Sequence, residues 1–261
     1  MEKIPATVEI LTFNNETTIE TTLESVTLFD EILVIDGGST DRTLGIARRY
    51  GAKILMQDEK AKSEGRITDF ARVRNQGLEI AKHRWILFID SDEMLTPEVA
   101  AEIRDIATAE RPLFHAWNVP RKYVLDGIVI DCATTYPNLQ MRLFHLGHVG
   151  TFVKQVHERV LPNPGEAVGV LKHHMLVPLP PQRALWGKWQ QYLAIEEKRW
   201  QGVSRKKLLG KILNALKPLV LYLLRLPRVL FCGGRRMPLS YEIIYQRYNL
   251  SVLLRLVRHL I

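Results

Sequence analysis

The feature that most limits the possible folds is a short apolar run, residues 85–89, that ends in two aspartates. The run reads Trp85-Ile86-Leu87-Phe88-Ile89, rich in aromatic and branched side chains and too short to span a membrane. These properties are typical of a strand buried on both faces, as in the centre of a parallel sheet. Because extended backbone repeats its side-chain direction every two residues, we expect Asp90 and Asp92 to leave the strand end on the same side.

The two aspartates predict a cation site. Two carboxylates held together repel, and burying them unpaired costs free energy. A hard divalent cation relieves this repulsion, and ligation by oxygen alone suits Mg²⁺ or Mn²⁺ better than zinc. Such a cation would bind a diphosphate. The alternative is that the acids only stabilise the N-terminus of the next helix, which Thr96-Pro97-Glu98 is suited to begin.

Strand and helix signals alternate over the first half of the chain. One helix is expected to run up to Arg49, with N-cap side chains at residues 39–41 and Gly51 placed to end it. A second helix is expected over about residues 68–82. The expected strands cover residues 7–12, 31–35, 52–56 and 85–90. Repeated βα units predict an α/β fold, a parallel sheet with helices on both faces, whose ligands bind beyond the carboxyl ends of the strands. Asp36 and the Asp90/Asp92 pair both fall at such ends.

From about residue 114 to 170 the pattern changes to strands and turns, which we interpret as an antiparallel extension of the sheet. The expected strands cover residues 114–120, 123–130 after a short break, and 139–145. Residues 161–165 form a turn, and the segment 178–181, rich in proline, precedes a final helical region that starts near Arg183.

The positive charge of the chain is concentrated in its tail. Residues 205–261 contain 12 Lys or Arg and one acid, whereas the remaining residues carry 24 basic and 27 acidic groups. A nucleic-acid-binding protein with a uniformly basic surface would not confine its positive charge to one segment in this way. We therefore expect no nucleic-acid partner. Residues 206–231 mix bulky apolar and basic residues, as in amphipathic helices that lie on anionic membranes, and Pro218 and Pro227 would break or bend this helix. Alternatively, its apolar face packs on the rest of the chain or on a partner subunit.

The sequence also bears on the cellular compartment. Cys132 and Cys232 lie far apart and follow no metal-binding spacing, so we expect two reduced thiols of a cytosolic protein. No uncharged apolar stretch approaches the roughly 18 residues that a membrane-spanning helix needs. Residues 1–5 lead directly into a strand pattern and offer no secretory signal.

Four motifs, in order over residues 7–160, resemble the inverting glycosyltransferase family 2 with its GT-A nucleotide-sugar-binding fold. The motifs are Thr12-Phe13-Asn14-Asn15-Glu16, Asp36-Gly37-Gly38-Ser39-Thr40-Asp41-Arg42-Thr43, Arg74-Asn75-Gln76-Gly77 and Asp90-Ser91-Asp92-Glu93. Tyr136-Pro137, residues 140–144 and Val156-His157-Glu158 narrow the resemblance to lipopolysaccharide-core glucosyltransferases and similar enzymes.

The resemblance implies a mostly parallel, Rossmann-like sheet with an antiparallel extension, and the charge and apolar pattern of the tail adds basic amphipathic helices after it. It implies a catalytic domain over residues 1–182, with a nucleotide-sugar-binding half at 1–112 and an acceptor half at 113–182. Residues 183–261 would then form the helical, membrane-associated tail.

The resemblance also assigns roles in binding the donor, a UDP-sugar. It implies that Asp36 contacts uracil, although this residue could instead cap the next helix. Arg74 offers a fixed fork of donors for a phosphate or a base carbonyl, unless it forms a surface salt bridge. Asp90 would contact the ribose or the metal, and Asp92 would be the principal ligand of Mn²⁺ or Mg²⁺. The remaining expected donor-binding residues are Thr12, Asn14 and Ser91.

Transfer with inversion needs a base that takes the proton of the acceptor hydroxyl. We expect Glu158 in this role, because the family places its acceptor site in the second half of the domain. Glu158 lies between His157 and Arg159, so a structural ion pair is the alternative. His157 could ligate the metal, contact the acceptor or be structural. Arg142 could bind phosphate or be an exposed strand residue.

These observations predict a peripheral enzyme on the cytoplasmic face of the inner membrane. It would transfer a hexose, with glucose from UDP-glucose as the expected donor, to a lipid-linked glycan such as lipopolysaccharide core. The alternatives are transfer to a polyprenyl phosphate and a non-catalytic module that binds nucleotide or anionic lipid. A nucleotidyltransferase would need a basic, Gly-rich loop after the first strand, where this chain has Asn14-Asn15-Glu16. The sequence does not predict an oligomeric state.

Overall fold

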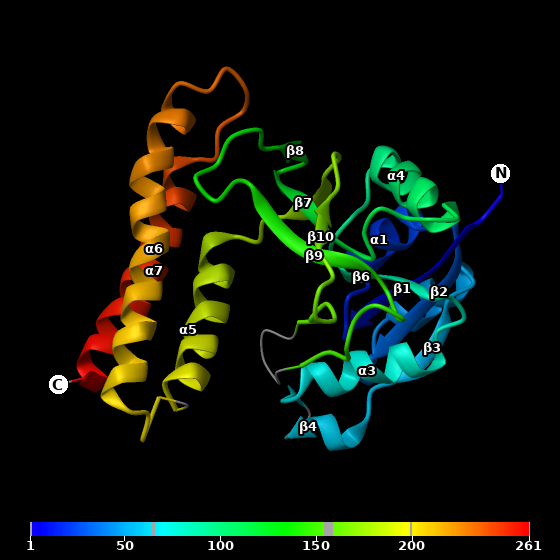
Figure 1. Cartoon of the computed structure of the whole chain (residues 1–261), viewed down its shortest axis with the longest axis horizontal. Helices are drawn as coiled ribbons and strands as arrows, with labels where there is room; N and C mark the ends of the chain where they lie inside the picture. The colour runs from blue at the N-terminus through cyan, green and yellow to red at the C-terminus, as the bar shows by residue number, and fades with distance from the viewer. Residues whose placement is uncertain (1, 64–65, 154–158, 199, 261) are drawn as a thin grey trace. The chain divides into compact units, whose positions relative to one another are not determined.

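The computed structural model describes the chain except residues 1, 64–65, 154–158, 199 and 261 (Figure 1). The chain divides into two compact units, and each unit is built from two separate stretches. Unit 1 comprises residues 1–122 and 137–177, and unit 2 comprises residues 123–136 and 178–261. The domain limits expected from the sequence stay a prediction.

Unit 1 is built on a mixed sheet in the order β10-β7-β9-β6-β1-β2-β3. Its parallel part consists of β1 (Ile4–Thr12), β2 (Phe29–Asp36), β3 (Lys53–Met56) and β6 (Trp85–Asp90). The antiparallel extension consists of β9 (Asn138–His145), which pairs with both β6 and β7 (Ala116–Leu125). The shorter elements are η1 (Glu59–Ala61), β4 (Lys62–Ser63), β5 (Arg66–Ile67), β10 (Val168–Val170) and β11 (Met175–Pro178).

Helices cover both faces of this sheet (Figure 1). The helices are α1 (Ile19–Ser25), α2 (Thr43–Arg49), α3 (Phe70–Ile80) and α4 (Pro97–Thr108). Leu87 and Ile89 pack in the core that α1, α2 and α4 share, whereas Ile86 and Phe88 pack in the core on the α3 side. The strand over 85–90 is therefore buried on both faces, as predicted from its composition.

Capping side chains begin α3 and α4. The N-cap expected at residues 39–41 is wrong, because α2 begins at Thr43 and its N-cap residue, Arg42, makes no side-chain cap hydrogen bond. Asp69 accepts a hydrogen bond from the backbone N–H of Arg72 at the start of α3, and Thr96 caps α4 with Pro97 in its first turn. Gly51, with a φ of +71°, follows α2 in the left-handed conformation that suits glycine.

The predicted break between strands 114–120 and 123–130 is wrong. Residues 116–125 form the single strand β7, which pairs through residue 121 with β9. The chain turns instead at Asp126 and Gly127, whose φ values are +51° and +75°. Two consecutive residues with positive φ form a two-residue turn that joins β7 to β8 (Ile128–Val129). Turns of this type are favoured in hairpins because their backbone twist matches that of the flanking antiparallel strands.

Unit 2 contains three long helices, α5 (Gln182–Lys198), α6 (Arg205–Leu230) and α7 (Leu239–Leu260). A buried cluster of Trp200, Leu208 and Leu256 joins α6 to α7. Pro218 and Pro227 lie inside α6, so the prolines do not break the helix in two. None of the helices in the described part of the chain combines the length and the apolarity that crossing a bilayer requires.

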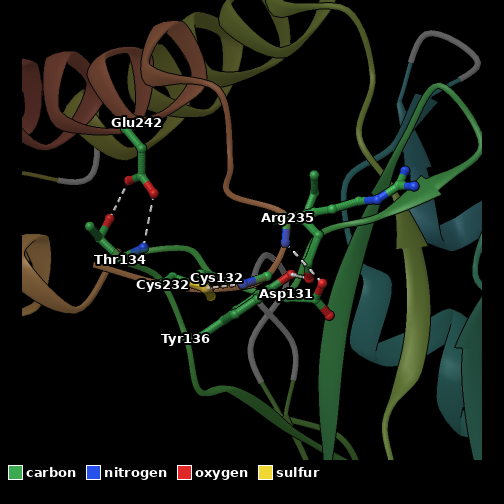
Figure 2. Close-up of a disulfide and its surroundings, with 9 residues drawn as sticks. Asp131, Cys132, Thr134, Tyr136, Cys232, Arg235 and Glu242 are labelled. Carbon is green, nitrogen blue, oxygen red and sulfur yellow. Dashed lines mark hydrogen bonds between the residues drawn. A yellow bond between two sulfur atoms is a disulfide. The ribbon is translucent and has the colours of Figure 1, made fainter. Parts of the chain in front are cut away.

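A disulfide joins Cys132 to Cys232 within unit 2 (Figure 2). The expectation of two reduced thiols is wrong because segments 100 residues apart in sequence run side by side here. The backbone N–H groups of Asp131 and Cys132 donate to the carbonyl of Arg235, and the N–H of Met237 donates to the carbonyl of Cys132. Glu242 accepts hydrogen bonds from the backbone N–H and the hydroxyl of Thr134 nearby.

Candidate active site

The carboxyl ends of β6, β1 and β2 bring the predicted acidic residues to one edge of the sheet. Leu11 is in register with Asp90, and Thr12 is in register with Asp36. Because β1 lies between β6 and β2, Asp36 and Asp90 are separated by two strand spacings, about 10 Å. The two motifs thus lie at one edge of the sheet, as the βα pattern predicts.

Asp36 shapes the loop that follows β2. Its side chain is fully buried, and Oδ2 accepts hydrogen bonds from the backbone N–H groups of Gly38 and Ser39, each at 2.8 Å. Oδ1 accepts from the hydroxyl of Ser39 at 2.5 Å. Gly38 has a φ of +100°, which a residue with a side chain rarely adopts. Asp36 therefore holds this loop in a fixed conformation at the strand end.

The loop after β1 is braced against the loop after β2. The N–H of Asn14 donates to the hydroxyl of Ser39, and the side-chain carbonyl of Asn14 accepts from the N–H of Thr40, both at 2.8 Å. The hydroxyl of Thr12 lies 3.2 Å from Oδ1 of Asn15. Asn14 has a φ of +50°, which asparagine tolerates better than most residues. Two sequence motifs thus fix each other's backbone.

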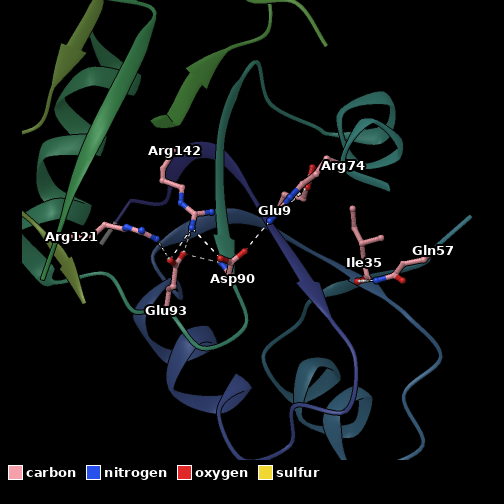
Figure 3. A network of polar contacts seen from close by, with 8 residues as sticks. All are labelled: Glu9, Ile35, Gln57, Arg74, Asp90, Glu93, Arg121 and Arg142. Atoms are coloured by element: carbon pink, nitrogen blue, oxygen red, sulfur yellow. Dashed lines mark hydrogen bonds and ion pairs between the residues drawn. The ribbon is translucent and has the colours of Figure 1, made fainter. Parts of the chain in front are cut away.

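Arg74 is buried in the interior and holds two carboxylates (Figure 3). It donates from Nη1 to Glu9 at 3.1 Å and from Nη2 to Oδ1 of Asp90 at 3.0 Å. A side chain at Gly77, one turn further along α3, would collide with the carboxylate of Glu9. The Arg-Asn-x-Gly motif therefore positions Asp90, and the surface salt bridge considered as an alternative is wrong for Arg74.

Arg142 holds the other side of Asp90. It is buried on β9 and donates from Nη2 to Oδ2 of Asp90 at 3.1 Å and to Glu93 at 2.8 Å (Figure 3). Arg121 on β7 donates to the same Glu93 at 2.9 Å. The alternative of an exposed strand arginine is wrong for Arg142. Within the described part of the chain, the cluster pairs three guanidinium groups with the three carboxylates of Glu9, Asp90 and Glu93.

Two acids of this cluster have shifted pKa values in opposite directions. Burial tends to raise the pKa of Asp90, but the charges of Arg142 and Arg74 outweigh it and hold this pKa well below its ordinary value. Burial raises the pKa of Glu93 above its ordinary value, despite Arg142. The Asp90 side chain is 50% exposed and that of Glu93 only 2%. Asp90 is thus an ionised carboxylate that faces solvent.

Asp92 and Ser91 follow in a tight turn after β6. Asp92 is exposed and Ser91 is buried. The N–H of Glu93 donates to the carbonyl of Asp90, and the N–H of Asp90 donates to the side chain of Glu93, both at 3.0 Å. Asp90 and Asp92 supply oxygen ligands of the kind that Mg²⁺ or Mn²⁺ prefers, so the donor set fits such an ion. Their roles, and those of the other expected donor-binding residues, stay predictions.

Beside this cluster, α3 holds the loop at residues 152–153. The side chain of Asn75 donates to the carbonyl of Phe152 at 3.1 Å and accepts from its N–H at 2.8 Å. A pocket of about 730 Å³ opens there, lined in part by Asp58, Arg72, Asn75, Gln76 and Phe152. Glu158 and His157, the expected base and its neighbour, lie outside the described residues.

Sequence reasoning missed Glu9 and Gln57 and assigned no role to Glu93. Glu9 is the one charged residue of β1, which is otherwise apolar apart from Thr7 and Thr12, and this is a signal of a buried ion pair. Gln57 is buried after β3 and donates from Nε2 toward the carbonyls of Thr12 and Ile35, at 3.4 and 3.3 Å. It has no comparable signal, because an isolated glutamine in a loop is ordinary.

Comparison with known proteins agrees with this geometry. Residues 7–119 match the model of glycosyl transferase family 2. The chain carries a glycosyl transferase family 2 domain. The fold is the GT-A type that the sequence predicts, with a mostly parallel core, an antiparallel extension and helices at the C-terminal end.

Curated relatives match parts of the chain. A TPR repeat-containing protein of Synechococcus elongatus is 38% identical over 38% of this chain. The prophage-derived glycosyltransferase SunS of Bacillus subtilis is 29% identical over 57% of this chain, and the matches span 23% and 33% of these two relatives. The lipopolysaccharide core biosynthesis glycosyltransferase LpsC of Rhizobium meliloti is 28% identical over 66% of this chain and 63% of its own length.

The solved structures that match this chain have lower sequence identity to it than these curated relatives. The Staphylococcus aureus protein TarS, residues 1–349, matches with a TM-score of 0.47 and 16% identity over 74% of this chain and 65% of that chain. The glucosyl-3-phosphoglycerate synthase of Mycobacterium tuberculosis, in complex with Mn²⁺, UDP and glucosyl-3-phosphoglycerate, matches with a TM-score of 0.34 and 24% identity over 47% of this chain and 44% of that chain.

Proposed function

We propose that this protein is an inverting hexosyltransferase that transfers glucose from UDP-glucose to a lipid-linked glycan, such as lipopolysaccharide core. The observation that carries this proposal is the carboxylate of Asp90, half-exposed at the end of β6 and kept ionised by the buried Arg74 and Arg142. A fixed negative charge at the carboxyl ends of parallel strands suits a ribose hydroxyl or a metal-bound diphosphate.

The donor nucleotide would bind across the ends of β1, β2 and β6. The braced loops at Thr12, Asn14 and Asp36 would form the uracil and ribose side of the site. Since Asp36 already accepts three hydrogen bonds, it would act mainly by presenting its loop, with its remaining lone pairs toward the base. Arg74 would act by orienting Asp90.

Asp92 and Asp90 would hold Mn²⁺ or Mg²⁺. Asp92 is exposed, and each oxygen of Asp90 has acceptor capacity beyond the guanidinium that it contacts. The bound ion supplies positive charge that offsets the charge developing on the leaving diphosphate.

The acceptor hydroxyl would attack the anomeric carbon as its proton passes to Glu158. The new bond to the anomeric carbon forms on the face opposite the leaving UDP as the bond to UDP breaks. The configuration at this carbon is therefore inverted. Glu158 is proposed as the base because the resemblance to the family places the acceptor site in the second half of the domain. We expect Glu158→Gln to bind UDP-glucose normally and to lose transfer. Normal turnover in this variant would exclude Glu158 as the base.

A lipid-linked acceptor is supported by the surface of α6. One stripe of α6, which includes Leu208 and Ile212, packs toward α7, so the packing alternative accounts for this face. A second stripe at helical spacing nevertheless stays exposed: Leu209, Leu213, Leu216, Val220, Leu223, Leu224 and Leu230. An exposed apolar patch of this kind marks an interaction site.

Charge supports an anionic membrane surface as the partner of this stripe. Lys206, Lys207, Lys211, Lys217 and Arg228 are exposed on the same helix. Leucines that enter the acyl boundary and lysines that meet anionic head groups are the two components of interfacial binding. The enzyme would then meet its acceptor at the membrane surface.

Calorimetric titration with UDP and UDP-glucose, with and without Mn²⁺, tests the donor site. We expect metal-dependent binding that Asp92→Ala abolishes. Asp105→Ala, an exposed aspartate on α4, is the matched control and should bind like the wild type. The absence of binding to either uridine ligand would contradict the proposal. Transfer to polyprenyl phosphate but not to a glycolipid would replace the proposed acceptor.

A further inference from the structure

Two histidines and a glutamate meet at the opposite end of the sheet from the candidate active site. The Nδ1 atoms of His115 and His148 lie 3.2 and 2.6 Å from the two oxygens of Glu166. The two imidazole rings stack face to face, with centroids 3.4 Å apart and an angle of 4° between the planes. The potential ligand atoms of all three residues lie within 4.8 Å of one another.

Backbone hydrogen bonds hold these three residues in place. The carbonyl of His115 accepts from the N–H of His145, and the carbonyl of His145 accepts from the N–H of His148. The carbonyl of His148 accepts from Asn163, whose own carbonyl accepts from the N–H of Glu166. These hydrogen bonds join three segments that are far apart in sequence, and they hold the backbone from which the three side chains converge.

The cluster is remote from Asp90. His145 is in register with Trp85, the first residue of β6, whereas Asp90 is its last. At about 3.3 Å per residue, the two ends of β6 are roughly 16 Å apart. None of the residues proposed to bind the nucleotide sugar belongs to the cluster. A ligand here would therefore be independent of the proposed transfer reaction.

We propose that His115, His148 and Glu166 form a binding site for a divalent transition metal of the Zn²⁺ type. Two imidazole nitrogens and one carboxylate oxygen form a ligand set that zinc accepts, with a fourth position left for water. Ligands of a tetrahedral zinc ion lie about 3.3 Å from one another, given bond lengths of about 2.0 Å. To bind one ion, the two stacked rings would tilt apart, because the Nδ1 lone pairs of parallel rings do not meet at one point.

A simple histidine–carboxylate ion pair explains this arrangement less well. Both imidazoles are directed at Glu166, and each Nδ1 faces a different oxygen of the same carboxylate. A metal ion binds both rings in their neutral form and keeps the carboxylate ionised. The three side chains are 26–35% exposed, so an ion can enter from solvent.

The test is titration of the full-length Asp92→Ala protein, stripped with a chelator, with ZnCl₂ and separately with CoCl₂. This background removes the principal ligand of the proposed donor-site metal. We expect about one Zn²⁺ per chain and a Co²⁺ spectrum in the visible range that indicates imidazole ligation. We also expect Zn²⁺ to raise the melting temperature, because it ties three segments of unit 1 together.

His148→Gln and Glu166→Gln should each weaken Zn²⁺ binding by at least about 10–100-fold, the range that loss of an outer-shell partner already causes. Glu166→Gln keeps a hydrogen-bonding side chain of the same shape, and circular dichroism checks its fold. The matched control is His173→Gln, which removes a histidine that pairs with a single carboxylate, Glu102, and should bind like the parent. The inference is overturned if the parent binds no Zn²⁺, or if both cluster variants bind it as the parent does.

Discussion

At the residue scale, the arginines that pair with Asp90 set the charge and the orientation of its carboxylate. Burying the guanidiniums of Arg74 and Arg142 is costly, and such buried pairs seldom add net stability relative to a well-packed apolar core. What they provide here is a carboxylate with a fixed direction and a fixed charge. Asp90 reaches solvent, whereas Glu9 and Glu93, which balance the arginines, do not.

Arg74→Leu should destabilise the protein by about 3–5 kcal/mol, because it leaves the buried carboxylate of Glu9 without this guanidinium. Urea unfolding gives this difference. Arg72→Leu, two residues earlier on α3, removes a more exposed ion pair with Asp58 and should stay close to the wild type. If the two variants unfold alike, the ion pair at Arg74 has no structural importance. Glu9→Gln should partly restore stability in the Arg74→Leu background.

The low pKa of Asp90 predicts a stability difference that depends on pH. The folded-state pKa lies below the ordinary value of 3.8, so its ionised form stabilises the fold above about pH 4. This contribution is lost as the pH falls through the folded-state value. Wild type should therefore exceed Asp90→Asn by about 1 kcal/mol at pH 7, a figure reduced because the side chain is half-exposed.

Unfolding in urea at pH 7, 4 and 2.5 measures this gap, which should shrink toward the acid end. Glu93, whose raised pKa acts in the opposite direction, is present in both proteins and largely cancels. A gap that stays constant with pH would show that Asp90 has an ordinary pKa.

At the element scale, α6 carries more apolar surface than its packing against α7 uses. Leu224→Glu places a charge in the exposed stripe and should weaken binding to vesicles of anionic lipid several-fold, because insertion of this face becomes costly. Co-sedimentation measures the effect. Leu113→Glu makes the same change at a leucine of unit 1 that is 81% exposed, and should leave binding unaltered. Equal binding by all three proteins, or equal binding to neutral vesicles, would exclude the interfacial role.

The elements show how far local sequence determines structure. The strand at 85–90 and helices α3 and α4 were predictable, because periodicity, caps and Pro97 are encoded within each segment. The continuity of β7 was not, because pairing with β9 decides it. Arg142 illustrates the same limit at the site: its strand was predicted, but its burial beneath Asp90 depends on β6 and β9 meeting in this register.

At the scale of the whole molecule, two stretches of each unit must find each other along the chain. The cysteine pair was missed for this reason, since contacts between residues 131–134 and 235–242 have no local signal. The bridge closes a loop between residues 100 positions apart, which lowers the entropy of the unfolded chain by an amount worth about 4–5 kcal/mol.

Reduction of the disulfide should therefore lower the stability of unit 2 by about 2–5 kcal/mol. Urea unfolding followed by circular dichroism, with and without a reductant, measures this change in the helical signal. The double variant Cys132→Ser/Cys232→Ser should match the reduced wild type and should not respond to the reductant. A wild type that is indifferent to reductant would show that the two thiols are not joined.

The bridge also changes what a protease can release. The bridged loop contains residues 137–177, which belong to unit 1, so the chain leaves unit 2 and returns to it inside a covalent ring. A single cut anywhere between residues 133 and 231 opens that ring without separating its two pieces. On a denaturing gel, such a nicked protein would run as one species until a reductant is added and would then resolve into two fragments.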